Sequence, residues 1–420
     1  MNIRSRLPQK AVNYFKHLPS AFLALLFYRF PSSKLKIIGV TGTDGKTTTV
    51  NLIYNVLKES GLSVSMISTV SALIKDKEID TGFHVTAPGA WQLQKLLRKM
   101  VDEETEYLVL EVTSHGLDQF RVLGISYEVG VITNVTNEHL DYHKTYETYL
   151  RTKAKLLMKS KVAILNTDDQ SYEYLINTLR NKGSKILSYG INKEADFTPK
   201  NFPFRTPLPG EYNQYNCLAA IAAAKVLGTK EETIRKAVAE FKGMVGRMEE
   251  IDEGQDFGVV VDFAHTPNAL EQALKTLKES LGKDKRLIVV FGAAGLRDKE
   301  KRPAMGKIAG KWADFSVVTA EDPRIEKVED ICEQIVQGIL AVGGKFKVVC
   351  KRQEAIDYAI GKLAKEGDIV VVCGKGHEKS MCYGEKEFPW SDQEAVRKAL
   401  QEVSKVSQVS KVSKAKKEVR

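Results

Sequence analysis

Short apolar runs alternate with longer amphipathic segments along most of the chain, a pattern that predicts strands alternating with helices. Residues 35–40, LKIIGV, form an apolar run rich in β-branched residues, which is typical of a buried parallel strand. After a turn, apolar residues recur with helical spacing from Val50 to Leu57, and Gly61 marks the end of that helix. We therefore predict an α/β protein with mostly parallel sheets.

The turn between this strand and this helix has the sequence TGTDGKTTT, Thr41 to Thr49, which is similar to a phosphate-binding loop. In a strand–turn–helix arrangement, free backbone N–H groups and the helix dipole point at an anion. The lysine would neutralise phosphate charge, and the next threonine offers a hydroxyl to Mg²⁺. The common template has four residues between its first glycine and Gly-Lys, whereas two stand here, so an ordinary glycine-rich turn remains the alternative. The candidate nucleotide-binding residues are Gly42, Thr43, Asp44, Gly45, Lys46, Thr47 and Thr48.

Two further apolar runs end in polar residues. The run YLVLE ends at Glu111, and VGVIT is followed by a polar segment that contains His139. The carboxyl ends of parallel strands are where α/β sheets place ligand-binding groups, so both positions are candidates. His139 alone would more often be a surface or capping residue. The spacing around Lys153 does not distinguish it from a solvated lysine.

Charge is concentrated at the two ends of the chain. The 420 residues carry a net charge of +10. Residues 1–36 contain seven Lys/Arg and no acid, and residues 404–420 contain six against one, so residues 37–403 carry about −2. A nearly neutral body argues against nucleic acid as a partner. Five cysteines without a C-x-x-C pair indicate free thiols in a reducing cytoplasm, where we expect the protein to act.

The basic ends themselves predict different structures. Residues 21–30, AFLALLFYRF, are too few to span a bilayer and predict a helix packed on the first domain. The alternative is peripheral contact of residues 1–34 with an anionic membrane surface. The tail from residue 404 repeats Val, Ser and Lys with little apolar surface, and we expect it to be disordered.

Ten motifs in order resemble those of the Mur ligases. They are TGTDGKTTT, EVTSH, TNVTNEHLDYH, RTKAK, GEYNQYN, GRMEEI, VVDFAHTPNAL, FGAAGLRDKEKRP, EDPR and GKGHE, spread over residues 35–400. The resemblance implies a central P-loop sheet domain followed by a Rossmann-like α/β domain. The expected organisation is a basic N-terminal stub at 1–34, a central ATP-binding domain at 35–242, a C-terminal domain at 243–403 and a tail at 404–420.

The resemblance also implies a reaction. ATP would phosphorylate a carboxylate of the acceptor, and an amine would then attack the acyl phosphate to give an amide, ADP and phosphate. Mg²⁺ would be held by Thr47, Glu111, His139 and Lys153, the last as a carbamate. Asn213, Asn216, Arg247 and Asp262 match nucleotide-binding positions, and the catalytic residues implied are Lys46, His139, Lys153, Arg247 and His265.

The substrates follow from the branch of the family that adds the third amino acid of the peptidoglycan stem peptide. Thr86, Thr113, Gln119 and Arg121 match positions that hold the muramoyl dipeptide. The amino acid would be meso-diaminopimelate, because a guanidinium at Arg324 suits its extra carboxylate. The other residues implied at this pocket are Arg297, Glu321, Asp322, Pro323, Gly374 and Glu378.

Several departures and alternatives remain. Asp44 stands where the family usually has Asn, and Glu321 and Asp322 add negative charge that would favour L-lysine. Family members place a uridine-binding domain of roughly a hundred residues before the loop strand, whereas residues 1–34 are too few for a domain of that size. We therefore expect turnover to depend only weakly on the uridine part of the acceptor substrate. The alternatives are a lysine-adding ligase, a folylpolyglutamate synthase-like ligase, a P-loop motor or switch, and a non-catalytic scaffold. We expect a monomer.

Overall fold

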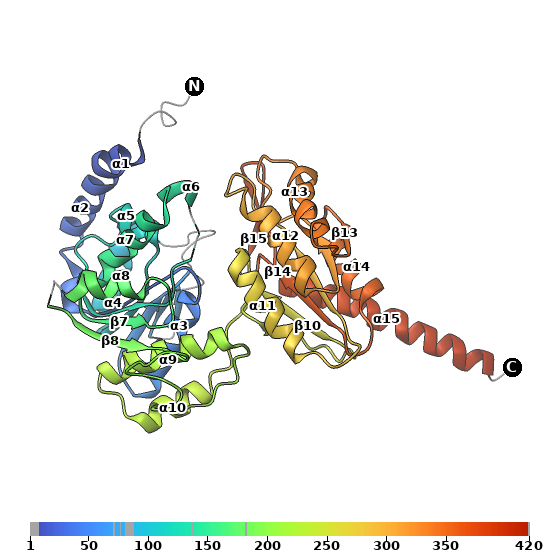
Figure 1. Ribbon diagram of the computed structural model, residues 1–420, viewed down its shortest axis with the longest axis horizontal. Helices are drawn as coiled ribbons and strands as arrows, with labels where there is room; N and C mark the ends of the chain where they lie inside the picture. The colour runs from blue at the N-terminus through green and yellow to red at the C-terminus, as the bar shows by residue number, and fades with distance from the viewer. Residues whose placement is uncertain are drawn as a thin grey trace. The chain divides into compact units, whose positions relative to one another are not determined.

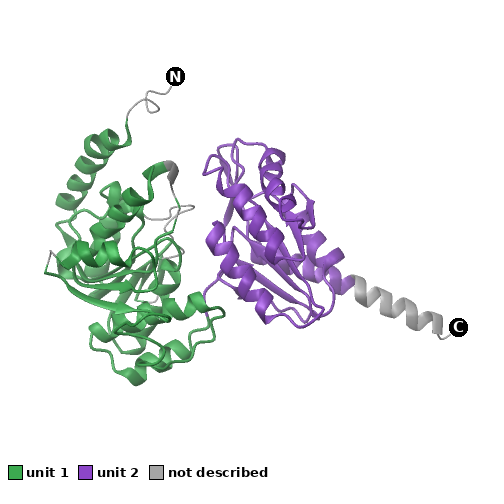
Figure 2. Cartoon of the chain, viewed as in Figure 1, with its two compact units in different colours: residues 1–242 green, residues 243–420 purple. Residues whose placement is uncertain are grey.

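The structure, a computed structural model, describes residues 8–69, 72–75, 77–79, 88–136, 138, 140–180 and 183–418. The chain forms two compact units, residues 1–242 and 243–420 (Figure 2). Each unit is built on its own mostly parallel sheet with helices packed against it. The predicted α/β class is therefore confirmed.

One sheet forms the centre of the first unit. Its described strands are β1 (Lys36–Thr41), β2 (Val64–Ile67), β3 (Ala72–Ile74), β4 (Lys77–Ile79), β5 (Tyr107–Glu111), β6 (Tyr127–Ile132), β7 (Ser160–Asn166) and β8 (Lys185–Tyr189). They have the order β4-β3-β2-β5-β1-β6-β7-β8. The strands from β2 to β8 in this order pair in parallel, while β3 and β4 are antiparallel to their neighbours. The loop strand β1 thus lies between β5 and β6.

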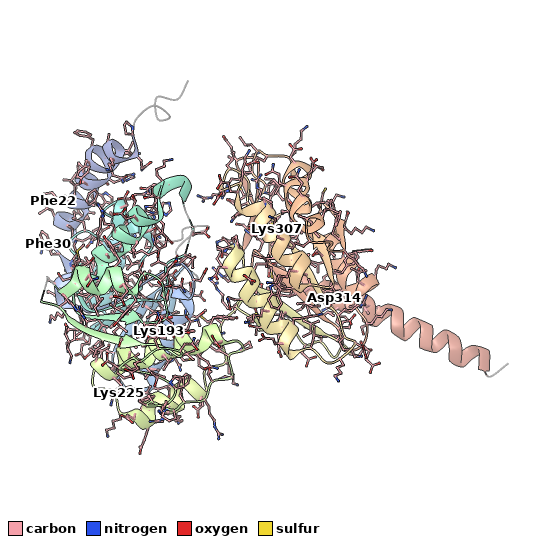
Figure 3. The ribbon with its side chains drawn as sticks, viewed as in Figure 1. Phe22, Phe30, Lys193, Lys225, Lys307 and Asp314 are labelled. Atoms are coloured by element: carbon pink, nitrogen blue, oxygen red, sulfur yellow. The ribbon has the colours of Figure 1, made fainter. Side chains whose placement is uncertain are left out.

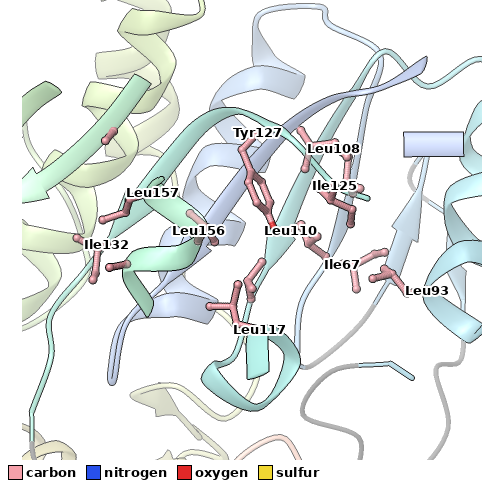
Figure 4. Close-up of a cluster of buried hydrophobic side chains, with 14 of the residues drawn as sticks. Ile67, Leu93, Leu108, Leu110, Leu117, Ile125, Tyr127, Ile132, Leu156 and Leu157 are labelled. Carbon is pink, nitrogen blue, oxygen red and sulfur yellow. The ribbon is translucent and has the colours of Figure 1, made fainter. Parts of the chain in front are cut away.

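Helices cover both faces of this sheet. They are α3 (Lys46–Glu59), α4 (Ala90–Asp102), α5 (Ser114–Asp118), α6 (Leu140–His143), α7 (Tyr146–Leu157), α8 (Tyr172–Arg180), α9 (Glu211–Val226) and α10 (Glu231–Ala239). In Figure 1, α3, α9 and α10 lie together on one face, and α4, α5, α7 and α8 lie on the other. Figure 4 shows the second of these layers, where Leu93, Leu110, Tyr127 and Leu156 pack in one apolar cluster. Because both faces are covered, the central strands are mostly apolar and buried.

The N-terminal segment adds a nearly continuous helix to the first unit. It consists of α1 (Gln9–Val12), the π-helical turn η2 (Asn13–His17) and α2 (Leu18–Phe27), and a 3₁₀ turn, η3 (Pro31–Lys34), connects it to β1. Helix α2 packs on α4, and its residues Ala21, Ala24 and Leu25 are buried. Among the described residues, none of the helices has the length and apolar character needed to cross a bilayer.

A second sheet forms the centre of the other unit. Its strands are β9 (Glu249–Glu250), β10 (Gly258–Asp262), β11 (Leu287–Phe291), β12 (Phe315–Val318), β13 (Phe346–Val348) and β14 (Ile369–Cys373), and a separate hairpin consists of β15 (Ser380–Tyr383) and β16 (Lys386–Pro389). The order is β13-β12-β11-β14-β10-β9, with all pairs parallel except β9 with β10. The two faces bury separate apolar clusters, one with α11 (Pro267–Ser280), α12 (Lys301–Trp312) and α13 (Val328–Leu340), and one with α14 (Arg352–Tyr358), η4 (Ala359–Leu363) and α15 (Asp392–Glu418).

Helix α15 extends further than the sequence suggested. It begins in the core of the second unit, where Val396 and Leu400 are buried, and it continues to Glu418. We expected residues 404–420 to be disordered. A helix that is already nucleated by packing adds further residues at little cost, and Val recurs every third position from Val403, a spacing compatible with a helix.

Candidate active site

The glycine loop of the first unit is held in shape by residues that follow β6. Gly45 has a φ of 79°, a left-handed conformation that favours glycine, and it directly precedes α3. The backbone N–H of Asp44 donates to Oδ1 of Asn134 at 3.0 Å, and the carbonyl of Asp44 accepts from Oγ1 of Thr133 at 2.6 Å. These contacts fix the backbone at Asp44, so the loop is braced whichever of Asp or Asn stands at this position.

Thr47 and Glu111 meet at the carboxyl ends of β1 and β5. Oγ1 of Thr47 donates to Oε2 of Glu111 at 2.9 Å. Thr69 donates to the same carboxylate through its backbone N–H at 2.9 Å and its hydroxyl at 2.6 Å. Glu111 is buried, so these donors hold its two oxygens in a fixed orientation beside the loop.

The two candidate lysines of this unit lie on either side of the loop. Nζ of Lys46 donates to the carbonyl of Thr43 at 2.6 Å, and Nζ of Lys153 donates to the carbonyl of Gly42. Lys153 is fully buried, with its ammonium 4.4 Å from the centre of the Tyr149 ring. Burial, together with the nearby charge of Lys46, lowers the pKa of Lys153 well below its usual value. The fold therefore favours a neutral amine at this position.

The remaining loop residues and two asparagines of α9 also lie at the glycine loop. Oγ1 of Thr43 lies 3.2 Å from the hydroxyl of Tyr149, and Thr48 lies partly exposed in the first turn of α3. On α9, Nδ2 of Asn216 donates to Oδ1 of Asn213 at 3.0 Å, and Asn216 lies so close to Gly45 that an added Cβ there would approach its Oδ1 to 2.3 Å. Both asparagines are thus buried beside the loop.

The acceptor residues are only partly described. Thr86 lies outside the described residues. Thr113 caps α5, its hydroxyl accepting from the N–H of Gly116 at 3.1 Å. Oε1 of Gln119 accepts from Nε and Nη2 of Arg121 at 3.1 and 2.7 Å. Gln119 and Arg121 are therefore brought together, as a set of this kind requires.

In the second unit, Arg247 and His265 both contact the ring of Phe263. The guanidinium of Arg247 lies 4.5 Å from the centre of the Phe263 ring, and the rings of Phe263 and His265 are 4.4 Å apart. Asp262, the last residue of β10, accepts from the backbone N–H groups of Met248 and Ala264, both at 2.8 Å. Burial raises the pKa of Asp262. The carboxylate of Asp262 therefore fixes the backbone next to Arg247 and next to His265.

The candidate amino-acid pocket is formed by two loops that follow β11 and β12. The N–H of Gly295 donates to the carbonyl of Asp322 at 3.0 Å, and Nη1 of Arg324 donates to the carbonyl of Gly295 at 2.6 Å. That side-chain bond uses one of the five N–H donors of a guanidinium. Arg297 lies exposed on the first loop, whereas Pro323 is buried on the second.

A buried lysine compensates the charge that the second loop adds. Nζ of Lys375 donates to Oδ1 of Asp322 at 2.9 Å and also to Oε2 of Glu378. Gly374, just before it, has a φ of 113°, and an added Cβ there would approach Glu321 to 2.2 Å. Burial raises the pKa of Glu321 to about 7. The added negative charge near the pocket is therefore smaller than the sequence suggested.

Two family models match the chain. The Mur ligase middle domain matches residues 40–224, and the Mur ligase, glutamate ligase domain matches residues 246–376. The chain belongs to the Mur ligase family. The UDP-N-acetylmuramoyl-L-alanyl-D-glutamate--2,6-diaminopimelate ligase 1 of Clostridium acetobutylicum is 38% identical over 403 residues, which cover 91% of this chain and 82% of that protein. The resemblance drawn from the ten motifs is confirmed, and this Mur ligase is an enzyme of the ligase class.

Solved structures agree with the family. The structure of a UDP-N-acetylmuramoyl-L-alanyl-D-glutamate--2,6-diaminopimelate ligase superposes with a TM-score of 0.60 at 34% identity, covering 87% of this chain and 78% of that one. A Mycobacterium tuberculosis folylpolyglutamate synthase, complexed with ADP and AMPPCP, gives a TM-score of 0.70 at 16% identity, covering 85% and 92%. The second likeness is one of fold alone.

The residues of this Mur ligase fit a Mg²⁺ ion. Oγ1 of Thr47 and Oε2 of Glu111 are adjacent oxygens at the mouth of a phosphate-binding loop, and hard oxygens are the ligands that Mg²⁺ prefers. His139 lies outside the described residues. Among the described residues, His, Cys, Asp and Glu form no group of three or more that could hold a metal by themselves. Thr47 and Glu111 alone would leave most of the coordination sphere of Mg²⁺ to other oxygen ligands.

Sequence reasoning missed three residues that shape the Mur ligase site. Asp169 follows β7, accepts from the N–H of Val135 at 3.2 Å and contributes negative charge near Lys153; burial raises its pKa. Its position after a parallel strand is the signal that identified Glu111. Phe263 and Arg352 had no such signal, because a ring platform and a buried arginine depend on residues far apart in the sequence.

Arg352 stabilises the two chain segments that lead into the candidate amino-acid pocket. It is fully buried and makes two bonds to the carboxylate of Asp392, at 2.8 and 2.7 Å. The same guanidinium donates to the carbonyls of Ala320 and Cys373 at 3.2 and 2.9 Å. It therefore ties together the chain just after β12 and the end of β14, from which the Glu321 and Gly374 segments begin.

Proposed function

We propose that this Mur ligase is an ATP-dependent amide ligase that adds meso-diaminopimelate to a muramoyl-L-alanyl-D-glutamate acceptor in peptidoglycan synthesis. The observation that carries this proposal is the cluster of Lys46, Thr47, Glu111 and Lys153 around one glycine loop. Such a cluster supplies positive charge and oriented oxygens where phosphoryl groups would bind. The names of the relatives supply the substrates, which belong to the proposal.

The residues of the first unit would carry the activation step. ATP phosphorylates the acceptor carboxylate and ADP leaves, because oxide is a poor leaving group from a carboxylate and phosphate is a good one. Lys46 would neutralise the transferred phosphoryl group, and Thr47 and Glu111 would hold Mg²⁺. The bound ion supplies charge neutralisation between the two anions that must approach each other.

Lys153 would act as a carbamate. The neutral amine adds to carbon dioxide, one N–C bond forms and one proton is released, so a potential cation becomes an anionic oxygen donor. The lowered pKa of Lys153 supports this role, since only the unprotonated amine is a nucleophile.

The second unit would select the amino acid. Arg324 can receive the distal carboxylate of diaminopimelate with its remaining N–H donors. Glu378 would hold the distal ammonium, and Gly374 would offer a backbone carbonyl. The pairing of Asp322 with Lys375 supports diaminopimelate over L-lysine, because it reduces the negative charge that would favour a lone ammonium. L-lysine remains the second candidate substrate.

An ADP-release assay with two acceptors and three amino acids would test the proposal. The acceptors are the muramoyl dipeptide and dihydropteroate, and the amino acids are meso-diaminopimelate, L-lysine and L-glutamate. We expect turnover with the dipeptide and diaminopimelate. A preference for L-lysine would overturn the amino-acid assignment alone, whereas glutamate addition to the pteroate would overturn the peptidoglycan assignment.

We place the reaction in the cytoplasm, with small molecules as substrates and a monomer as the acting species. All five cysteines are free, which agrees with a reducing compartment. Sedimentation velocity at micromolar concentration tests the monomer, and a dimer at these concentrations would contradict it.

A further inference from the structure

The N-terminal helical segment presents an apolar outer face. The side chains of Phe15 and Phe27 are 85% and 70% exposed. Figure 3 labels Phe22 and Phe30, which lie on the outer side of the first unit. The exposed large apolar residues of this face, which we call the outer face, are Tyr14, Phe15, Phe22, Leu23, Leu26, Phe27, Phe30 and, from α4, Trp91. So many exposed large apolar residues on one segment and the helix beside it are unusual on a surface that meets only water.

Aromatic residues continue this face onto α4. The ring of Trp91 lies 5.7 Å from that of Phe27 and 6.3 Å from that of Tyr28. Nε1 of Trp91 donates to Oγ of Ser20 at 3.1 Å, so the indole is held in place on the segment. Trp and Tyr with an apolar body and a polar tip are the residues that favour a membrane–water interface.

The charges of the helical segment itself have a single sign. From Pro8 to Lys36 the sequence contains no Asp or Glu. Lys10, Lys16, Arg29 and Lys34 are exposed. Two copies of this face packed together would bring cations against cations, whereas anionic lipid headgroups would complement them.

We propose that the outer face docks this protein onto an anionic membrane surface. The helical segment would lie in the plane of the headgroups, with its phenylalanines and leucines at the acyl boundary and its lysines at the lipid phosphates. This inference goes beyond the ligase reaction and does not depend on which amino acid is added.

Docking would bring the acceptor residues near the membrane. Nδ2 of Asn13, on the inner side of the segment, donates to Oδ2 of Asp118 at 2.7 Å. The ring of Tyr14 lies 5.5 Å from that of Phe120. Asp118 and Phe120 flank Gln119, one of the candidate acceptor residues, so the docking segment and the acceptor site form one structure within the first unit.

Co-sedimentation with vesicles tests the proposal on the full chain. The vesicles are phosphatidylglycerol and phosphatidylcholine in equal parts, with pure phosphatidylcholine for comparison. We expect the protein to sediment with the first and at least about tenfold less with the second. The variant with Phe15→Ser, Phe22→Ser and Leu23→Ser should lose at least about tenfold in partitioning while keeping its ADP-release rate.

Matched controls separate this face from other apolar or basic surfaces. Leu340→Ser with Val342→Ser and Val348→Ser removes exposed apolar residues of the second unit and should leave partitioning unchanged. Lys10→Gln with Lys16→Gln should reduce partitioning about tenfold, while Lys283→Gln with Lys345→Gln should not. A chain that ends at residue 404 should still bind, because the basic tail is not part of the outer face.

Three results would overturn the proposal. One is equal sedimentation with and without the anionic vesicles. Another is a pair of results: the triple serine variant binds the anionic vesicles fully, and the chain that ends at residue 404 no longer binds them. The third is a concentration-dependent dimer that the triple serine variant abolishes, since the outer face would then be an interface between two copies.

Discussion

At the carboxyl edge of the first sheet, Lys46 and Lys153 donate to backbone carbonyls, whereas at the same edge of the second sheet Lys375 and Arg352 donate to carboxylates. The first arrangement leaves two lysine side chains without a hydrogen-bonded carboxylate among the described residues, which suits the phosphate chemistry proposed above. The second satisfies charge within the protein and uses it to fix loops. Under the proposed function the two edges would therefore differ in role: the first would act on phosphate, and the second would hold the shape of the amino-acid pocket.

The largest expected effect is that of Lys46→Ala. Removing the ammonium from the loop should reduce ADP release by about a thousandfold or more, because transition-state charge on the phosphoryl group loses its partner. The unfolding temperature should change little, since the hydrogen bond that the ammonium makes among the described residues is to the carbonyl of Thr43 in its own loop. Lys58→Ala, exposed on the same helix, is the control. Near-normal turnover in Lys46→Ala would remove the distinction between the two edges.

Lys153→Ala should reduce turnover by about a hundredfold or more while leaving a folded protein. If a carbamate is the active form, short-chain carboxylates should partly restore activity, and removing carbon dioxide from the buffer should lower wild-type activity. Lys155→Ala, two residues away on the same helix, should have little effect. An alanine variant at 153 that turns over normally would exclude the carbamate.

Arg324→Ala should raise the KM for diaminopimelate about ten- to a hundredfold with a smaller change in kcat, because a charged hydrogen-bonded pair is lost. The KM for L-lysine should not rise. Arg397→Ala, a surface arginine of the same unit, serves as the control. An unchanged KM would mean that Arg324 only braces the carbonyl of Gly295, which would make the second edge wholly structural.

Glu321 should affect stability rather than turnover, with a defined pH dependence. Burial raises its pKa to about 7 from a usual value of 4.5, so the protonated form is favoured on folding. The unfolded chain loses this proton first as pH rises, so stability should fall between pH 4.5 and pH 7 and then level off.

Glu321→Gln should remove that fall and be the more stable form at pH 8, by up to about 3 kcal/mol. Urea unfolding at pH 4.5 and pH 8 measures the difference, with the exposed Glu366→Gln as control. Equal stabilities of wild type and Glu321→Gln at both pH values would show that the buried carboxyl ionises without cost.

The sequence predicted the strand-end residues best. Glu111 follows from a simple rule, since an apolar run that ends in an acid marks the edge of a parallel sheet where ligand-binding groups are placed. Asp262 also ends a strand, but it was identified through the family resemblance. Lys153 could be identified only through the family, because its contact with the carbonyl of Gly42 joins positions 111 residues apart. The burial that lowers the pKa of Lys153 depends on the packing of the whole first unit, so no local sequence pattern predicts it.

Other residues were beyond sequence reasoning for related reasons. From the sequence, Asp322 counted as added negative charge that would favour L-lysine. The pairing of Asp322 with Lys375 weakens that argument, and it could not be seen from the motif because the two residues lie 53 positions apart. The length of α15 was underestimated because a weak helix former is extended by the packed helix before it. The roles of all the candidate site residues remain predictions, and His139 and Thr86 also lie outside the described residues.

The ion pair of Arg352 and Asp392 has a consequence for synthesis. The two residues are 40 positions apart, and Asp392 opens the last helix of the chain. While the ribosome still holds that helix, Arg352 has no carboxylate partner and the segments that begin at Ala320 and Cys373 are not yet tied together. A chain released before residue 392 would lack both the Asp392 carboxylate that pairs with Arg352 and the apolar residues that α15 adds to the core, and we expect this to destabilise incomplete copies and expose them to proteolysis. The segments that begin at Ala320 and Cys373, beside the candidate amino-acid pocket, are thus tied together only after the start of the last helix has been synthesised.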